Sequence, residues 1–153
     1  MRIRSKQGFT LIELLIVVAI IGIIAAIAIP NLLNAIQRGK QKRTMADMRS
    51  IGTAVESYQV DNGIPPNNTA GDAKTQLSAV LEPTFIRQLP SLDGWKGTVQ
   101  WAHASGSDEY TLQSYGKGSV AASCTINITT KGFTDDLCYS NGQFTQYPEG
   151  TQQ

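Results

Sequence analysis

The sequence is poor in the residues on which most enzyme active sites depend. Its 153 residues include one histidine, His103, and two cysteines, Cys124 and Cys138. His103 has no cysteine or serine at a spacing typical of a nucleophile and its base, so we interpret it as a structural side chain. The formal net charge is +1, whereas nucleic-acid-binding proteins have a clustered basic face. We therefore expect no enzymatic activity and no nucleic-acid partner.

Long apolar runs are also absent, with one exception at the N-terminus. Residues 1–8 are basic, Phe9 to Ile29 are almost wholly apolar, and the remainder is polar and rich in glycine. As an α-helix, a run of this length spans roughly 31 Å, which is the thickness of the hydrocarbon core of a bilayer. Such a helix is apolar on every side, so lipid, protein, or each at different times must cover it.

The sequence leaves open whether this run is a membrane anchor or a cleaved secretory signal. Ala26-Ile27-Ala28 fits the small-x-small cleavage pattern, but the run is longer than a usual signal core. It also contains the carboxylate of Glu13, which costs about 2.5–3.5 kcal/mol inside a membrane and is therefore usually functional. The simpler explanation is that Glu13 extends toward the nearby interface.

A motif at the start of the run narrows these alternatives. Gln7-Gly8-Phe9-Thr10-Leu11-Ile12-Glu13 resembles the processing signal of type IV prepilins and type II secretion pseudopilins. The resemblance implies that a prepilin peptidase cuts between Gly8 and Phe9 and methylates Phe9. Residues 1–8 are then a leader, residues 9–30 a transmembrane and assembly helix, and residues 31–153 a globular pilin-like domain. We expect Glu13 to pair with the new N-terminus of a neighbouring subunit and to set the axial register.

The remaining residues predict an α+β domain. Apolar residues at helical spacing follow the apolar run, and Asp61-Asn62-Gly63 predicts the end of one helix of about fifty residues. A second, short helix is expected over 72–81. Alternating residues predict strands around 99–103 and 110–114, and Asn141-Gly142 predicts a hairpin between 137–140 and 143–147. The expected fold is a long helix packed on a small C-terminal antiparallel sheet. The apolar helix positions are Met45, Met48, Ile51, Val55 and Tyr58.

The domain also resembles one branch of this family. The segments 93–95, 108–112 and 114–116 are similar to the C-terminal half of the major pseudopilin of type II secretion systems. In that group an acidic loop binds calcium, and the corresponding residues here are Asp135 and Asp136, with backbone carbonyls near Ser114 as further ligands. A solvated acidic turn is the alternative, because calcium prefers six to eight oxygen ligands.

The cysteines bear on the same question. An even number of cysteines in an exported chain favours a disulfide between Cys124 and Cys138. A C-terminal disulfide loop is more typical of the pilins of type IV pili, so two hypotheses for a filament subunit stand. One is a secretion pseudopilin that drives protein export, and the other is a pilin for adhesion, motility or DNA uptake. A secreted binding module with a cleaved signal is the third.

The resemblance further implies location and partners. The subunit would sit in the bacterial inner membrane with its domain in the periplasm and polymerise with copies of itself. Its other expected partners are the prepilin peptidase, the inner-membrane assembly platform and the minor pseudopilins. Calcium is the one expected cofactor.

Overall fold

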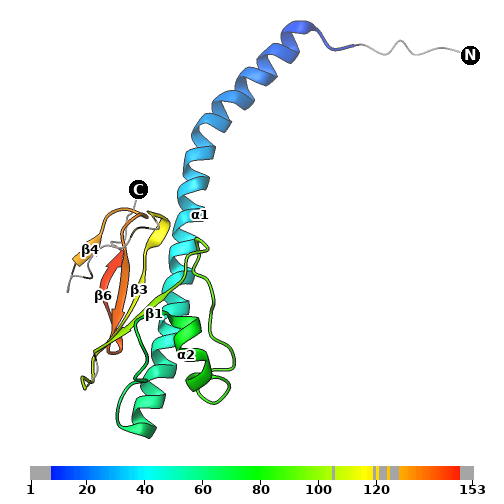
Figure 1. Cartoon of the computed structure of the whole chain (residues 1–153). Coiled ribbons are helices and arrows are strands. Elements are labelled where there is room, and N and C mark those ends of the chain that lie inside the picture. Colours follow the sequence, from blue (N-terminus) through cyan, green and yellow to red (C-terminus); the bar gives the residue numbers. More distant parts are fainter. Residues whose placement is uncertain (1–7, 105, 119, 121–123, 125–127, 149–153) are drawn as a thin grey trace, which may run out of the picture. The chain divides into compact units, whose positions relative to one another are not determined.

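The computed structural model of the chain describes residues 8–104, 106–118, 120, 124 and 128–148. Its contacts divide the chain into two compact units, Met1–Ile36 and Gln37–Gln153. The first unit contains the start of helix α1 (Figure 1), and the second contains the rest of that helix together with every strand. The predicted leader, residues 1–8, lies outside the described residues except for Gly8.

Helix α1 runs from Leu11 to Asn62, a length of 52 residues, which confirms the predicted helix of about fifty residues. It continues through Pro30, although proline has no N–H to donate to the preceding turn. Gly63 adopts a positive φ of 83° and donates its N–H to the carbonyl of Gln59 at 2.7 Å. A glycine in this left-handed conformation ends many helices because it has no Cβ to clash.

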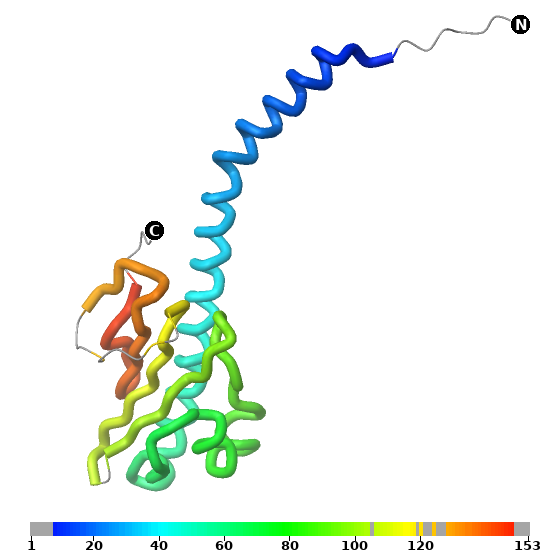
Figure 2. Tube along the Cα trace, turned by 45° about the horizontal axis from the view of Figure 1, so that its top comes forward, coloured from blue at the N-terminus to red at the C-terminus, as the bar shows by residue number. Residues whose placement is uncertain are grey.

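A six-stranded sheet forms the other layer of the second unit. The strand order is β1-β2-β3-β5-β6-β4, and Figure 2 shows the long strands running beside one another. Neighbouring strands are antiparallel, except that β4 pairs with β6 in parallel. The strands are β1 (Gly71–Asp72), β2 (Gln100–His103), β3 (Tyr110–Ser114), β4 (Ile128–Thr130), β5 (Leu137–Ser140) and β6 (Gln143–Pro148).

These strands confirm the α+β class and both predicted strand pairs. Asn141 and Gly142 have positive φ values of 46° and 86°, as the two-residue turn between β5 and β6 requires. The sheet departs from the expectation in two places, because the sequence predicts neither β1 nor the parallel strand β4. Strands of two and three residues are too short to show an alternating pattern.

The short elements follow local signals. Helix α2 spans Ala73–Leu81, and the carboxylate of Asp72 caps it by accepting the N–H of Lys74 at 2.8 Å. A single 3₁₀ turn, η1, covers Gly116–Gly118.

The core of the second unit lies between α1, α2 and the sheet. The predicted apolar stripe of α1 is confirmed, because Met48, Ile51 and Val55 are fully buried while Met45 and Tyr58 pack against them at its edge. Opposite this stripe lie the large buried side chains of the sheet and of α2: Leu77, Leu81, Trp101, Tyr110, Leu112, Leu137 and Tyr139.

A carboxylate fixes the sheet to the helix at one edge of this core. Glu56 on α1 accepts hydrogen bonds from the hydroxyls of Tyr110, at 2.8 Å, and Tyr139, at 3.4 Å. Burial raises the pKa of both tyrosines, and the neighbouring carboxylate raises it further. Both phenols therefore stay neutral and remain donors. The ring of Tyr139 lies over Gly52, where an added Cβ would come within 2.2 Å of its Cε1 atom.

A turn at Asp93 makes a second connection between α1 and the sheet. The buried Asp93 accepts the N–H groups of Trp95 and Gly97 on one carboxylate oxygen and the hydroxyl of Ser114, in β3, on the other. Gly94 lies so close to α1 that an added Cβ would be 2.3 Å from the carbonyl oxygen of Lys40. Its N–H donates to the Thr44 hydroxyl at 2.9 Å. The turn thus anchors the long loop before β2 on the helix.

We predict that Gly52→Ala destabilises the domain, because the new methyl group would overlap the Tyr139 ring and force the sheet away from α1. We expect a loss of about 1–3 kcal/mol in the free energy of unfolding. Thermal unfolding of the purified full-length chain in detergent, followed by the near-ultraviolet circular dichroism of the aromatic residues, measures it.

Gly39→Ala is the matched control in the same helix, since nothing lies within 4 Å of its added Cβ. It should be neutral or stabilising by up to about 1 kcal/mol, because alanine favours helix over glycine. Equal stability of the two variants would contradict close packing at Gly52.

Candidate functional site: an exposed apolar helix with a capped start

The first half of α1 exposes a long apolar surface. Every large apolar side chain from Leu11 to Ile36 is at least 45% exposed, and Phe9 is 85% exposed. By length and composition, α1 is the one helix in the described residues that can cross a membrane. The side chains concerned are Leu11, Ile12, Leu14, Leu15, Ile16, Val17, Val18, Ile20, Ile21, Ile23, Ile24, Ile27, Ile29, Leu32, Leu33 and Ile36.

An apolar surface of this size is unstable in water, so it must be covered by lipid or by other protein. The exposure is uniform around the helix, which distinguishes it from the second half of α1, where one face is buried in the core. This half is therefore a membrane anchor, an assembly surface, or both in succession.

The predicted processing junction lies just before this helix. Gly8 and Phe9 are both exposed and precede the first helical residue, Leu11. A peptidase needs an accessible peptide bond outside regular secondary structure, and the exposure of both residues is compatible with that requirement. Cleavage between Gly8 and Phe9 stays a prediction.

Glu13 takes part in a reciprocal cap of the helix start. Its carboxylate oxygen Oε2 accepts the backbone N–H of Thr10 at 2.8 Å and the Thr10 hydroxyl at 2.7 Å. In return, the N–H of Glu13 donates to the hydroxyl oxygen of Thr10 at 3.3 Å. This is the capping-box arrangement, in which a threonine before the helix and a glutamate three residues later satisfy otherwise unpaired donors.

The cap explains how a carboxylate is tolerated at the edge of an apolar run. Both of its residues follow the Gly8–Phe9 bond, so the cap is retained if that bond is cut. A carboxylate offers about four acceptor positions, so Glu13 can hold the Thr10 groups and still accept from a further donor. The predicted pairing with a neighbouring subunit is thus compatible with the cap, and it stays a prediction.

The acidic loop before β5 is a smaller candidate site. Asp135 accepts the N–H groups of Lys131 and Gly132, both at 3.0 Å, and the buried Asp136 accepts the side-chain amide of Gln113 at 2.6 Å. The carbonyl oxygens of Phe133 and Asp135 converge on the position that a Cβ of Gly116 would occupy, at 2.8 and 2.6 Å.

These groups all offer oxygen ligands, which calcium prefers, but they amount to two carboxylates and two carbonyls for an ion that takes six to eight oxygens. Within the described part of the chain, no three histidine, cysteine, aspartate or glutamate side chains come together as a metal site. Calcium binding by Asp135 and Asp136 stays a prediction.

The predicted disulfide between Cys124 and Cys138 is confirmed. The two Cα atoms are 5.9 Å apart, and Cys138 is fully buried in β5. The two cysteines are 14 residues apart in the sequence, and the bond closes a loop that contains the acidic turn. It ties the end of that loop to a central pair of strands.

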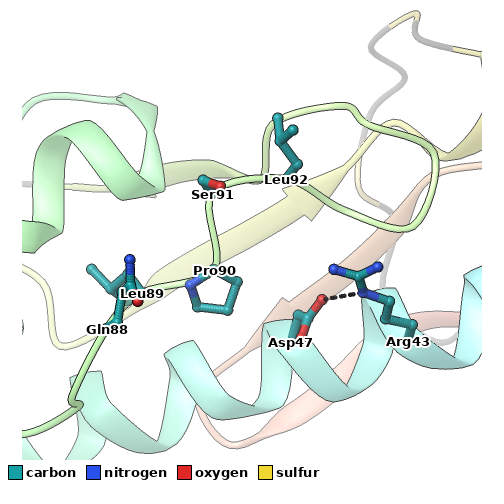
Figure 3. A pocket seen from close by; sticks show the side chains of 7 residues that line it. All are labelled: Arg43, Asp47, Gln88, Leu89, Pro90, Ser91 and Leu92. Atoms are coloured by element: carbon teal, nitrogen blue, oxygen red, sulfur yellow. Dashed lines mark ion pairs between the residues drawn. The ribbon is translucent and has the colours of Figure 1, made fainter.

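Two pockets of the second unit have no catalytic arrangement among the described residues that line them. One pocket has a volume of about 450 Å³ and is lined by α1 and the loop 88–92. Figure 3 shows its lining residues, with Arg43 and Asp47 on the helix side. Their charged groups are 3.6 Å apart, from Nε to Oδ2. A second pocket, of about 340 Å³, lies beside Cys124 and the β5–β6 turn. The predicted structural role of His103 agrees with its ring, which contacts the carbonyl of Ser107 at 2.7 Å and stacks on Trp101.

Sequence reasoning missed the Thr10–Glu13 cap and the contacts that the Asp93 turn makes with α1 and with Ser114, although Asp93-Gly94 itself predicts a turn. The cap had a signal in the sequence, because a threonine three residues before an acidic residue ahead of an apolar run is typical of a capping box. The docking of Gly94 on Lys40 had no such signal, since the two residues lie far apart in the chain.

A long helix with an apolar first half and a capped start, joined to a small antiparallel-dominated sheet, defines the class of pilin-like subunits. Comparisons with known proteins give the family. A model described as prokaryotic N-terminal methylation motif matches residues 3–29, and one described as type II secretion system (T2SS), protein G matches residues 31–127. The chain belongs to the type II secretion system protein G family.

Individual relatives agree with this assignment. The chain is 30% identical to a type II secretion system core protein G of Vibrio cholerae over 125 residues, 77% of this chain and 84% of that protein. It is 27% identical to a protein of the same name from Klebsiella michiganensis, in a match that covers 78% of this chain and 89% of that protein. It is also 42% identical to the fimbrial protein EcpB of Eikenella corrodens, in a match that covers 57% of this chain and 55% of that protein. No solved structure matches the chain significantly.

We predict that loss of the disulfide lowers the stability of the domain. The bond closes a loop of about 15 residues, for which the chain-entropy model gives a contribution of about 3 kcal/mol to the free energy of unfolding. Dithiothreitol should lower the unfolding temperature of the wild-type chain. The double variant Cys124→Ser/Cys138→Ala should start at the lower value and not respond to dithiothreitol. A wild-type chain indifferent to reduction would contradict a stabilising role.

Proposed function

We propose that this chain is the major pseudopilin of a type II secretion system. In this role it is a filament subunit that polymerises from the inner membrane and drives the export of folded proteins. The observation that carries the proposal is the exposed apolar half of α1, which has the capped carboxylate of Glu13 at its N-terminal end. Such a helix can reside in lipid as a monomer and pass into the core of a filament without changing its fold.

The family supports parts of this proposal directly. Membership of a family with the methylation motif implies processing by a prepilin peptidase and assembly into filaments. The apolar helix also fits a subunit anchored in the inner membrane. We extend this to a domain in the periplasm and to contacts with the assembly platform and the minor pseudopilins. The subunit acts by assembly and has no catalytic activity of its own.

A surface pilin is the second candidate, and one observation favours it. Fimbrial proteins are among the relatives, and the chain carries the Cys124–Cys138 disulfide. The secretion role has broader support, because the protein G match extends from residue 31 to residue 127. Deletion of the gene separates the two, since a secretion subunit loses protein export and a pilin loses surface fibres.

The methylation motif also argues against a secreted binding module with a cleaved signal. Mass spectrometry of the mature subunit distinguishes them. We expect an N-terminus at methylated Phe9, whereas ordinary signal cleavage after Ala28 would give Ile29.

We predict that Glu13→Gln abolishes filament assembly although it preserves the helix start. Glutamine still accepts the Thr10 N–H in a capping box, but it cannot form an ion pair with the N-terminus of a neighbouring subunit. Removing one partner of a buried pair costs about 3–5 kcal/mol, which is more than about a hundredfold in each association step. Electron microscopy of sheared filaments and the amount of exported protein measure the effect.

Glu13→Ala separates the two roles of this carboxylate, because it removes the cap as well as the charge. Amide exchange at Leu11 to Leu14 in detergent should be faster in Glu13→Ala than in Glu13→Gln. Lys117→Gln, which removes one charge from an exposed residue of the domain, serves as the control, and this variant should assemble normally. Normal filaments from Glu13→Gln would exclude the proposed ion pair.

We also predict that calcium raises the unfolding temperature of the domain, because an ion that binds only the folded chain stabilises it by mass action. Asp135→Asn should reduce the response, whereas Asp108→Asn, a change of equal charge in an exposed turn, should keep it. A calcium titration that leaves the wild-type unfolding temperature unchanged would exclude the site.

A further inference from the structure

Four basic residues follow the apolar half of α1: Arg38, Lys40, Lys42 and Arg43. We call this group the basic collar. It begins two residues after Ile36, the last of the exposed apolar residues in this stretch of α1. Between residues 14 and 46 the sequence contains these four positive charges and no acidic residue. The collar is therefore a concentrated positive charge at the border of the apolar surface.

Three of the four side chains of the collar are exposed. The buried positions of this part of α1 are Gln41, Thr44 and Met48, whereas Arg38, Lys42 and Arg43 are exposed and Lys40 is half-buried. Arg38 and Lys42 are four residues apart and thus lie on one face of the helix.

Among the described residues, Asp47 and Asp93 are acidic residues near the collar. Asp47 pairs with Arg43 at 3.6 Å, but the Arg43 side chain stays 71% exposed. Asp93, in the turn that packs on Lys40, is buried and accepts hydrogen bonds from Trp95, Gly97 and Ser114.

The spacing along the helix fits a bilayer. Glu13 and Arg38 are 25 residues apart, about 38 Å at the helical rise. A bilayer is about 40–45 Å thick including its headgroup layers. A helical segment of this length is thus long enough to cross the hydrocarbon core of a bilayer.

The position of the collar also departs from the positive-inside rule for membrane spans. Lysine and arginine near a membrane span are enriched on the cytoplasmic side, whereas in the proposed orientation the collar crosses to the opposite side. Positive charges kept at an unfavourable position indicate a use for them there.

We propose that the basic collar binds the phosphate groups of anionic phospholipids in the leaflet that faces the folded domain. Guanidinium and ammonium groups are the side chains that bind phosphate best, and clustered basic residues at a membrane surface attract anionic lipid. The contact holds the anchored subunit at a fixed depth before assembly. This inference rests on the proposed function, because it requires the membrane-anchored orientation.

The test measures the lipid that surrounds the full-length mature chain. The protein is reconstituted in phosphatidylcholine vesicles that contain a trace of spin-labelled phosphatidylglycerol or spin-labelled phosphatidylcholine. Electron paramagnetic resonance then gives the relative association of each lipid with the protein. We expect the wild-type chain to prefer phosphatidylglycerol by severalfold, with each basic residue contributing up to about fivefold. The preference should fall between about 20 mM and 500 mM salt.

Arg38→Gln/Lys42→Gln should lose most of this preference. Lys117→Gln/Lys131→Gln removes the same charge from two exposed residues outside the collar and should keep it. Equal unfolding temperatures show that both variants fold. An unchanged preference in the collar variant, or an equal loss in the control, would overturn the inference.

Two further results distinguish the lipid from other partners. Inorganic phosphate, added at constant ionic strength, should leave the lipid preference intact; its loss would mean that the collar binds free phosphate. A collar variant that keeps its lipid preference but forms fewer filaments would mean that the collar contacts a second copy of the chain, and this also overturns the inference. If the wild-type chain prefers anionic lipid but its deletion affects neither secretion nor fibres, the proposed function fails while the lipid contact stands.

Discussion

A helix that is apolar on every side cannot remain in water, and this constraint governs the rest of the subunit. Lipid can cover the first half of α1, and so can the same surface of other subunits. Because both environments are apolar, the same side chains suit either of them. The second half of α1 is different, because one of its faces is already buried under the sheet. One continuous helix thus serves two environments, and its side chains alone decide which part belongs to each.

Glu13 shows how a polar group fits within this constraint. Its carboxylate satisfies the first donors of α1 through Thr10, so it already has a local partner in the single subunit. The proposed ion pair in the filament adds a partner and does not create the need for one. This arrangement lowers the cost of keeping a charge at the membrane interface until a neighbour arrives.

Much of this fold was predictable from the sequence, and the exceptions share a physical cause. Helix α1, its buried stripe of Met48, Ile51 and Val55, and the hairpin at Asn141-Gly142 follow from local periodicity and turn chemistry. Strand β4 could not be predicted, because its parallel pairing with β6 depends on a long connection and on three residues without a pattern. The Glu56 contact with two tyrosines was hidden for a similar reason, since its partners lie 54 and 83 residues away.

The sequence by itself determined the membrane-length helix and the family, and it predicts the processing junction at Gly8 and Phe9, because each depends on residues adjacent in the chain. Tertiary structure decided how the domain is held on that helix. The close approaches at Gly52 and Gly94, the buried carboxylate of Asp93 and the closure of the disulfide all join distant segments. Such contacts depend on where the folded chain brings backbone and side chains together, and no local pattern contains that information.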